Sequence, residues 1–266
     1  MPVRTRAVAS RAALLMKLAR ERPDLFSDFE SCQMPDCPRS FTVVRRVARG
    51  NEARSDQDSS LDESDEKVAN NFLEEEIRCE AEYVHSKDLP DELKTSLVDI
   101  TRENMKELYD RAGETRLSWV WNDQKKIDEL SHKSARHFIV YASAGKTSST
   151  SHTTDDSASV SESNSTREVI GFAHIRFEIE VGRELVYLYE FQVAPKYMGC
   201  GIGKYLLKLV EASAAAMKCQ EVCLTCFKAN DALNFYKKYG FKLDPDSPDE
   251  KSCPYEILSK PVKKKK

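Results

Sequence analysis

Hydrophobic and polar positions divide the chain into a polar first quarter and a patterned remainder. Residues 23–70 show no sustained periodicity and end in an acidic run, NEARSDQDSSLDESDEK, which has too little apolar surface to order itself. We therefore expect residues 1–70 to form a basic N-terminal segment and a flexible, disordered acidic linker. The folded domain is expected to span residues 71–260, and residues 261–266 form a basic tail.

The domain begins with helical patterns. Residues 72–84 suit an extended or a helical entry element, whereas residues 89–112 repeat apolar side chains at helical spacing. Residues 122–132 predict a second, shorter helix. Two β-rich runs follow, separated by a serine- and threonine-rich tract that is much longer than a hairpin needs. We expect this tract, near residues 143–166, to be a disordered insertion.

Beyond the insertion, strands alternate with helices. Strands are predicted at 184–195, 221–228 and 253–260, and helices at 201–218 and 230–240. Strands that first follow one another and then alternate with helices are typical of an α/β fold. We predict a mixed, mostly antiparallel sheet with helices on both faces.

Composition and charge narrow the class of protein. Of the 266 residues, 40% are hydrophobic and 32% are charged, which is typical of a soluble globular protein. No apolar run approaches the roughly 20 residues of a membrane span, so we expect no integral membrane protein. The eight cysteines lack the paired spacings and accompanying histidines of a zinc site. We expect reduced thiols and no metal.

Three of the nine glycines, Gly199, Gly201 and Gly203, lie within five residues, between a predicted strand and a predicted helix. Such a loop presents free backbone N–H groups at a helix N-terminus, where a phosphate group binds, and glycine lets the backbone approach the anion. A glycine-rich turn that only connects a strand to a helix would have the same sequence pattern. The spacing matches neither the dinucleotide-binding fingerprint nor the Walker loop.

The residues after the loop sharpen this interpretation. From Tyr187 onward the chain resembles the GNAT acetyltransferase superfamily, in which a strand, a phosphate loop and a helix precede an N-x-x-A, F-Y and G-F element. That element is here Asn230, Ala232, Phe235, Tyr236, Gly240 and Phe241. The loop departs from the superfamily's pattern at Met198, where an arginine or glutamine is usual.

A closer resemblance covers roughly residues 72 to 260. The pieces NMKELYD, SWVW, AHIRFEIE, LVYLYEFQV, GIGKYLL, LTCFKAN and YEILS are similar, in this order, to the N-alpha-acetyltransferase 40 family, also called N-alpha-acetyltransferase D. The resemblance implies an enzyme that transfers acetyl from acetyl-CoA to the N-terminal amine of core histones. It implies a GNAT fold, a monomer, histone tails as the peptide partner, and no direct nucleic-acid or membrane binding.

The resemblance also implies a set of cofactor-binding residues. They lie at the end of the superfamily's fourth strand, in the glycine loop and in the element that follows. The residues expected to contact acetyl-CoA are Phe191, Gln192, Val193, Met198, Gly199, Cys200, Gly201, Ile202, Gly203, Lys204, Asn230 and Tyr236.

Acetyl transfer to an amine needs a base, a polarised carbonyl and a proton for the departing thiolate. On an ideal strand Tyr187, Tyr189 and Phe191 share one face, and Glu190 faces the other way with Leu188 and Gln192. A carboxylate in so apolar a strand is poorly solvated, which favours a general base. The resemblance assigns Glu190 this role, directly or through a water, and we also expect Tyr189 to be catalytic. A structural carboxylate satisfied by backbone amides is the alternative.

Acidic and aromatic residues indicate the substrate. Glu178 and Glu180 alternate onto one face near a strand end, where two carboxylates can accept the guanidinium of an arginine. The resemblance places its substrate-binding acids here, and histones four and two-A begin Ser-Gly-Arg-Gly. A solvated strand edge is the alternative. The aromatic walls of the peptide groove are expected to be Tyr109, Trp119, Tyr187 and Tyr255.

Other functions remain open from the sequence. An acetyltransferase for lysine side chains or small amines would keep the cofactor site but need a different groove, and a degenerate GNAT domain would serve only as a binding module. A nucleic-acid binder would rest only on the basic tail KPVKKKK. We expect a nuclear and cytoplasmic protein, although the arginine- and serine-rich first twenty residues also suit an organelle transit peptide.

Overall fold

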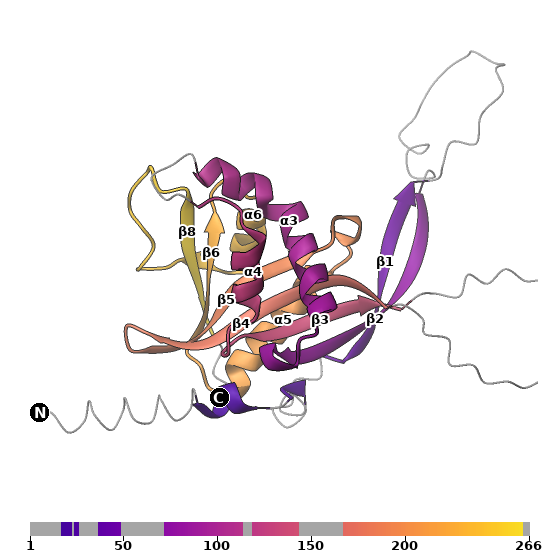
Figure 1. The fold of residues 1–266 in the computed structure, drawn as a ribbon, viewed down its shortest axis with the longest axis horizontal. Coiled ribbons are helices and arrows are strands. Elements are labelled where there is room, and N and C mark those ends of the chain that lie inside the picture. The colour runs from indigo at the N-terminus through magenta and orange to yellow at the C-terminus, as the bar shows by residue number, and fades with distance from the viewer. Residues whose placement is uncertain are drawn as a thin grey trace, which may run out of the picture.

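In the described part of the chain, eight strands form one sheet (Figure 1). The computed structural model describes residues 17–22, 24–26, 37–48, 72–113, 119–143 and 167–262. The strands of this part are β1 Ser40–Ala48, β2 Phe72–His85, β3 Arg136–Ala142, β4 Glu168–Glu180, β5 Arg183–Val193, β6 Glu221–Phe227, β7 Lys242–Leu243 and β8 Tyr255–Pro261. Their order in the sheet is β1-β2-β3-β4-β5-β6-β8-β7.

Most strand pairs are antiparallel. β1 to β5 follow one another as an antiparallel meander, β6 pairs in parallel with β5, and β8 pairs antiparallel with β6 and β7. A parallel pair needs a crossover connection, which α5, Ile202–Ala216, supplies between β5 and β6. The predicted mixed, mostly antiparallel sheet is confirmed.

Helices cover both faces of the sheet. Phe138 of β3 lies in the core cluster that contains Leu206 of α5, whereas the next residue, Ile139, packs with Leu97 and Leu130. Those two leucines belong to α3, Asp91–Gly113, and α4, Asp123–Leu130. Because successive side chains of a strand point to opposite faces, α3 and α4 lie on one face and α5 on the other (Figure 1).

The short helix α4 has a clear start and a clear buried side. Asn122 Oδ1 accepts a hydrogen bond from the backbone N–H of Lys125 at 2.8 Å, which satisfies one of the unpaired donors of the first turn. Lys126 and Leu130, four residues apart and therefore on one side of the helix, are both buried. None of the helices in the described ranges is both long and apolar enough to cross a membrane.

The ordered fold begins before the predicted boundary at residue 71. β1 pairs with β2 along its whole length, and Leu25 and Phe26 are buried, with the Phe26 ring edge-on to Phe138 at 6.0 Å. β1 is an edge strand in which Val43 is buried but Val44 is 47% exposed, so its alternation is weak in the sequence. The domain therefore includes residues of the predicted N-terminal extension. Most of the acidic linker and the serine-rich insertion lie outside the described residues.

Candidate active site

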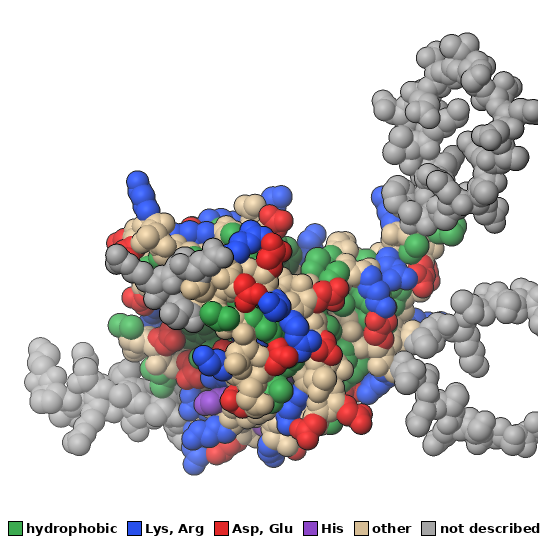
Figure 2. All heavy atoms as spheres, turned by 45° about the horizontal axis from the view of Figure 1, so that its top comes forward, with side chains coloured by type: hydrophobic (Ala, Val, Ile, Leu, Met, Phe, Trp, Pro, Cys, Tyr) green, Lys and Arg blue, Asp and Glu red, His purple; other side chains and the backbone are tan. Residues whose placement is uncertain are grey.

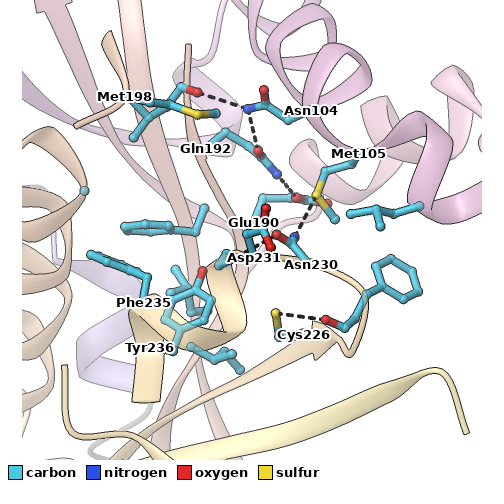
Figure 3. Close-up of a pocket in the computed structure, with 18 of the residues that line it drawn as sticks. Asn104, Met105, Glu190, Gln192, Met198, Cys226, Asn230, Asp231, Phe235 and Tyr236 are labelled. Carbon is cyan, nitrogen blue, oxygen red and sulfur yellow. Dashed lines mark hydrogen bonds between the residues drawn. The ribbon is translucent and has the colours of Figure 1, made fainter. Parts of the chain in front are cut away.

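A cleft opens where β5 and β6 separate. The two strands pair only between residues 185–188 and 221–224. Beyond this point β5 continues to Val193 and β6 to Phe227 without pairing to each other within the described sheet. The diverging ends open a cavity of about 690 Å³, lined by α3, β5, the glycine loop, β6 and α6, Ala232–Lys238 (Figure 3). Cavities of this size and concave shape hold small molecules and cofactors.

A β-bulge at Tyr189 changes which side chains of β5 face the cavity. Glu190 pairs with His174 and Leu188 pairs with Ile175, so Tyr189 is an extra residue. One extra residue reverses the alternation of side chains along a strand. Leu188 accordingly packs in the cluster that contains α5, whereas Glu190 faces α4. The predicted shared face of Glu190 holds for Gln192 but is wrong for Leu188, because the prediction assumed an ideal strand. For the same reason Phe191 packs against the α5 cluster and does not share a face with Tyr189, which stacks on His174.

Both carboxylate oxygens of Glu190 accept hydrogen bonds. Lys126 Nζ donates to Oε1, and Gln192 Nε2 donates to Oε2 at 3.0 Å. Asn104 of α3 continues this chain, because its Nδ2 donates to Gln192 Oε1 at 3.0 Å and to the carbonyl oxygen of Val193 at 3.0 Å. Glu190 is buried, with 6% of its surface exposed. The carboxylate thus sits in a polar network, and not in the apolar surroundings that the strand's composition indicates.

Lys126 is a site residue that sequence reasoning missed. Its Nζ also donates to the hydroxyl of Tyr109 at 2.7 Å and to Glu129 Oε2 at 2.8 Å. Burial opposes the charged form of Lys126, but Glu190, Tyr109 and Glu129 outweigh it and raise the pKa of the ammonium group. The only signal in the sequence is its position four residues before Leu130, on the apolar side of a short helix.

The glycine loop forms one end of the cavity. Gly199 and Gly201 have φ angles of 81° and 92°, values that favour glycine, and a Cβ at either position would meet nothing within 4 Å. α5 starts directly after Gly201, and its first hydrogen bond runs from Tyr205 N–H to the carbonyl of Gly201 at 3.0 Å. The backbone N–H groups of residues 202–204 therefore have no helical partner, which makes this end suitable for a phosphate anion.

Two predicted cofactor residues of the loop do not present their side chains to the cavity. Ile202 is completely buried in the core, and Cys200 packs against the core with its Sγ 3.8 Å from the carbonyl oxygen of Met198. Only their backbones remain available to a cofactor. Met198 is 55% exposed, and Lys204 lines the cavity close by. Lys204 is thus a cationic residue of the cavity lining, whereas Met198 carries no charge at the position where the resemblance leads one to expect arginine or glutamine.

The loop before α6, together with α6, closes the cavity opposite β5. Asn230 Oδ1 accepts from the N–H of Ala232 at 2.9 Å, and Asn230 Nδ2 contacts the sulfur of Met105 at 3.5 Å. Tyr236 reaches into the cavity (Figure 3), where its ring packs against Phe191 at 5.9 Å. Burial raises the pKa of Tyr236 well above its ordinary value, so this phenol keeps its proton and can act as a donor.

Four aromatic rings extend the cavity outward as a continuous wall. Tyr109 and Phe227 line the cavity and lie 5.2 Å apart. Trp119 packs edge-on to Phe227 at 5.9 Å and stacks on Tyr255 at 5.0 Å. Sequence reasoning missed Phe227, which it treated only as part of a strand. The wall places three of the four predicted groove aromatics side by side.

The fourth, Tyr187, belongs to a neighbouring cluster. Its ring lies 5.0 Å from that of Tyr189, and its hydroxyl shares a 2.6 Å hydrogen bond with Thr225. Tyr189 in turn stacks on His174 at 5.2 Å, and the guanidinium of Arg176 lies 3.9 Å from the Tyr189 ring centre. Burial lowers the pKa of His174 well below its ordinary value, so this imidazole is neutral near pH 7.

Glu178 and Glu180, called here the acidic pair, lie at the far end of β4, outside the cavity lining. Arg20, from the N-terminal segment, donates through Nη2 to Glu178 Oε2 at 3.1 Å and to the carbonyl oxygen of Phe177 at 2.9 Å. Burial and the neighbouring charge of Glu178 raise the pKa of Glu180. Both carboxylates act electrostatically on Tyr189, which places the pair near the tyrosine cluster. The sequence did not indicate that an arginine of the chain itself binds here.

One group of described side chains has the make-up of metal ligands, namely Glu221, Cys223 and Asp244. Arg183 Nη1 lies 2.7 Å from Glu221 Oε1 and 3.1 Å from Asp244 Oδ2. The guanidinium already balances both carboxylates, so this group does not require a metal ion.

The cavity brings together most of the predicted site. The predicted residues that line it are Tyr109, Tyr189, Glu190, Phe191, Gln192, Val193, Met198, Gly199, Gly201, Gly203, Lys204, Asn230 and Tyr236. Those that do not line it are Trp119, Glu178, Glu180, Tyr187, Cys200, Ile202 and Tyr255. The catalytic and binding roles assigned to them stay predictions.

Residues 156–243 match the family model of the acetyltransferase (GNAT) domain. The matched range includes β5 with Glu190, the glycine loop, α5 and α6. The predicted GNAT fold is confirmed. The prediction of acetyl-CoA as the cofactor agrees with this match.

Solved structures with a similar arrangement include three acetyltransferase-type proteins. PaiA N-acetyltransferase from Thermoplasma acidophilum, in complex with coenzyme A, has 20% identity and a TM-score of 0.42, over 69% of this chain and 98% of the neighbour. The ribosomal-protein-S18-alanine N-acetyltransferase from Escherichia coli has 12% identity and a TM-score of 0.43, over 70% and 96%. NAA60 from Arabidopsis thaliana, in complex with a bisubstrate analogue, has 14% identity and a TM-score of 0.42, over 68% and 97%.

Proposed function

We propose that this GNAT acetyltransferase modifies N-terminal amines and that its substrates are the histone tails that begin Ser-Gly-Arg-Gly. The observation that carries the proposal is the position of Glu190. Its buried carboxylate lies between the glycine-loop end of the cavity and the aromatic wall, and both of its oxygens are held by hydrogen bonds. An amine that enters along the wall would meet this carboxylate and the bound cofactor together.

The residues of the cleft fit acetyl-CoA, which supplies the acetyl group as an activated thioester. The N–H groups of residues 202–204 and the ammonium group of Lys204 would bind the pyrophosphate. Residues 189–193 of β5 have no partner strand on the β6 side, so their backbone groups are available to an extended pantetheine arm. The splayed strands thus bind the cofactor, and the glycine loop orients it.

Glu190 and Tyr236 would move the two protons of the reaction. Glu190 takes a proton from the incoming ammonium group, directly or through a water, so that the neutral nitrogen can attack the thioester carbonyl. A C–N bond would form, the C–S bond would break, and the phenol of Tyr236 would donate a proton to the departing sulfur. The second proton of the attacking nitrogen would then pass to the Tyr236 phenolate, directly or through a water, which gives the neutral amide and restores the phenol. The buried, protonated state of Tyr236 supports this assignment.

The acidic pair supports the choice of substrate. If Glu178 and Glu180 bind the third-position arginine, changing that arginine to alanine should lower kcat/KM by about ten- to hundredfold, or about 1.5–3 kcal/mol, because the pair is only partly buried. Lysine at this position should also reduce kcat/KM, since an ammonium group cannot span two carboxylates. Steady-state kinetics with the three peptides measures both effects.

The matched enzyme variant carries Glu178→Ala and Glu180→Ala together. It should lose activity toward the arginine peptide and change little toward the alanine peptide. Equal losses with both peptides would mean that the two acids shape the strand end or the general field, and that they do not recognise arginine.

Arg20 should compete with the substrate arginine for Glu178. Because its contact to Glu178 is partly exposed, Arg20→Ala should lower KM for the arginine peptide by about two- to fivefold. Lys17→Ala is the control, since Lys17 is exposed and contacts only Glu21 among the described ion pairs. An unchanged or higher KM in Arg20→Ala would show that Arg20 does not compete for the substrate site.

Mass spectrometry of a Ser-Gly-Arg-Gly peptide incubated with acetyl-CoA tests the proposed function. We expect one acetyl group on the terminal amine and none on a peptide with a blocked N-terminus and free lysines. The reverse result would favour the lysine acetyltransferase, and no acetyl-CoA binding would favour the binding module.

The alternative of a nucleic-acid binder finds no support on the face of the molecule drawn in Figure 2. Basic and acidic side chains are interspersed over the described part of that face, which therefore has no extended basic surface there.

A further inference from the structure

Lys126 is a buried cation directly beside the proposed base. Its side chain is 9% exposed, and that of Glu190 is 6% exposed. The three N–H donors of the ammonium group have three acceptors, which are Glu190 Oε1, Glu129 Oε2 at 2.8 Å and the Tyr109 hydroxyl at 2.7 Å. Lys126 is therefore held in place and has no donor left for a substrate.

Stability alone does not explain this ion pair. Removing two charges from water costs about as much as their attraction returns, and well-packed apolar residues of the same volume are often as stable. α4 is already attached to the sheet through Leu130, which packs with Leu97 and Ile139. Because α4 does not need a lysine on its buried side for stability, we look for the role of Lys126 in its effect on Glu190.

We propose that Lys126 is a positioning residue that keeps Glu190 ionised and oriented toward the cavity during acetyl transfer. This inference rests on the proposed role of Glu190 as the base. Burial favours the protonated form of a carboxyl group, which cannot take a proton from the substrate amine, and an adjacent ammonium group opposes this effect. Lys126 on Oε1 and Gln192 on Oε2 together fix the plane of the carboxylate.

The other titratable groups around the pair leave its charge balance simple. Burial raises the pKa of Tyr109 to about 12 and that of Tyr236 well above its ordinary value, and it lowers the pKa of His174. These three side chains are neutral near pH 7. The titratable groups that face the pair are Tyr109 of α3, Glu129 of α4, His174 of β4 and Tyr236 of α6. The charged side chains of this cluster are therefore Lys126, Glu129 and Glu190.

The test is the pH dependence of kcat at saturating acetyl-CoA and Ser-Gly-Arg-Gly peptide. In Lys126→Met the acid limb of the profile should move to higher pH by about one unit or more, because the carboxylate holds its proton to higher pH without the cation. At pH 7 kcat should fall about tenfold, the deficit should shrink as the pH rises, and KM should change less than about threefold. Lys126→Gln gives the same test if the methionine variant does not fold.

Two variants serve as controls for charge and for helix structure. Lys126→Arg keeps a cation, so its acid limb should stay near that of the wild type. Lys125→Met removes the same charge from the neighbouring, exposed position of α4 and should superimpose on the wild type. A deficit in Lys126→Met that is equal at every pH, with an unmoved acid limb, would show a merely structural role and overturn the inference.

A second measurement does not depend on the substrate. Carbon-13 NMR of glutamate-labelled free enzyme follows the Glu190 carboxyl signal, which is identified by its loss in Glu190→Gln. Its titration midpoint should be higher in Lys126→Met than in the wild type, and equal midpoints would overturn the inference. If the midpoints differ but the wild type acetylates no N-terminal peptide, the proposed function fails while the effect of Lys126 on Glu190 stands.

Discussion

Glu190→Gln should lower kcat for acetyl transfer by about 10²- to 10⁴-fold, the range that a positioned general base contributes. The amide keeps the shape of the side chain and can still accept a hydrogen bond from Lys126, but it cannot take a proton. KM for the peptide should therefore change little, because the ground-state contacts of the groove remain. Steady-state kinetics over a range of pH values measures both quantities.

The control for this prediction is Glu129→Gln. Glu129 is the other carboxylate on Lys126, but its contact lies on α4 and it does not line the cavity. Its replacement should have a much smaller effect on kcat. If Glu190→Gln retains wild-type turnover at every pH, Glu190 is a structural carboxylate and the proposed proton transfer is wrong.

Gly201→Glu should weaken acetyl-CoA binding by about a hundredfold or more while the protein remains folded. The new carboxylate would lie at the start of α5, beside the N–H groups proposed to bind the pyrophosphate, and like charges in contact cost several kcal/mol. Gly201 also has a φ of 92°, a backbone conformation that is strained for a residue with a side chain. Isothermal titration calorimetry measures the affinity, and circular dichroism checks the fold.

Gly182→Glu provides a matched control. Gly182 also has a positive φ, of 81°, and open space around its Cβ position, but it lies in the turn between β4 and β5. This variant carries the same charge and similar backbone strain away from the cavity, so its acetyl-CoA affinity should equal that of the wild type. Equal losses in both variants would mean that strain or net charge, and not the loop, controls cofactor binding.

The elements of the cofactor end could be predicted because their signals are local. The glycine loop, the apolar face of α5 and the β-rich runs around it each lie within one short stretch of sequence. β1 could not be predicted in this way, because an edge strand with one buried valine and one exposed valine has little alternation. Its pairing with β2 depends on contacts between distant parts of the chain.

The candidate site shows the same division. Glu190, the glycine loop and Tyr236 were predicted because the resemblance and the short-range pattern name them, and all of them meet at one cavity. Lys126 and Asn104 were missed, since a lysine and an asparagine on predicted helices are usually exposed. Their positions against β5 follow from the packing of α3 and α4 on the sheet.

The local pattern of residues indicates the succession of strands and helices from α3 onward apart from the two-residue β7, the phosphate-binding type of loop and the carboxylate in β5, because each depends on neighbouring residues. The direction in which that carboxylate points, and its contacts, follow from the packing of distant segments. The bulge at Tyr189 reverses the alternation of β5, the ion pair of Glu190 joins residues 64 positions apart, and Arg20 reaches Glu178 across 158 positions. Such contacts have no local signal, since they form only when the sheet brings distant segments together.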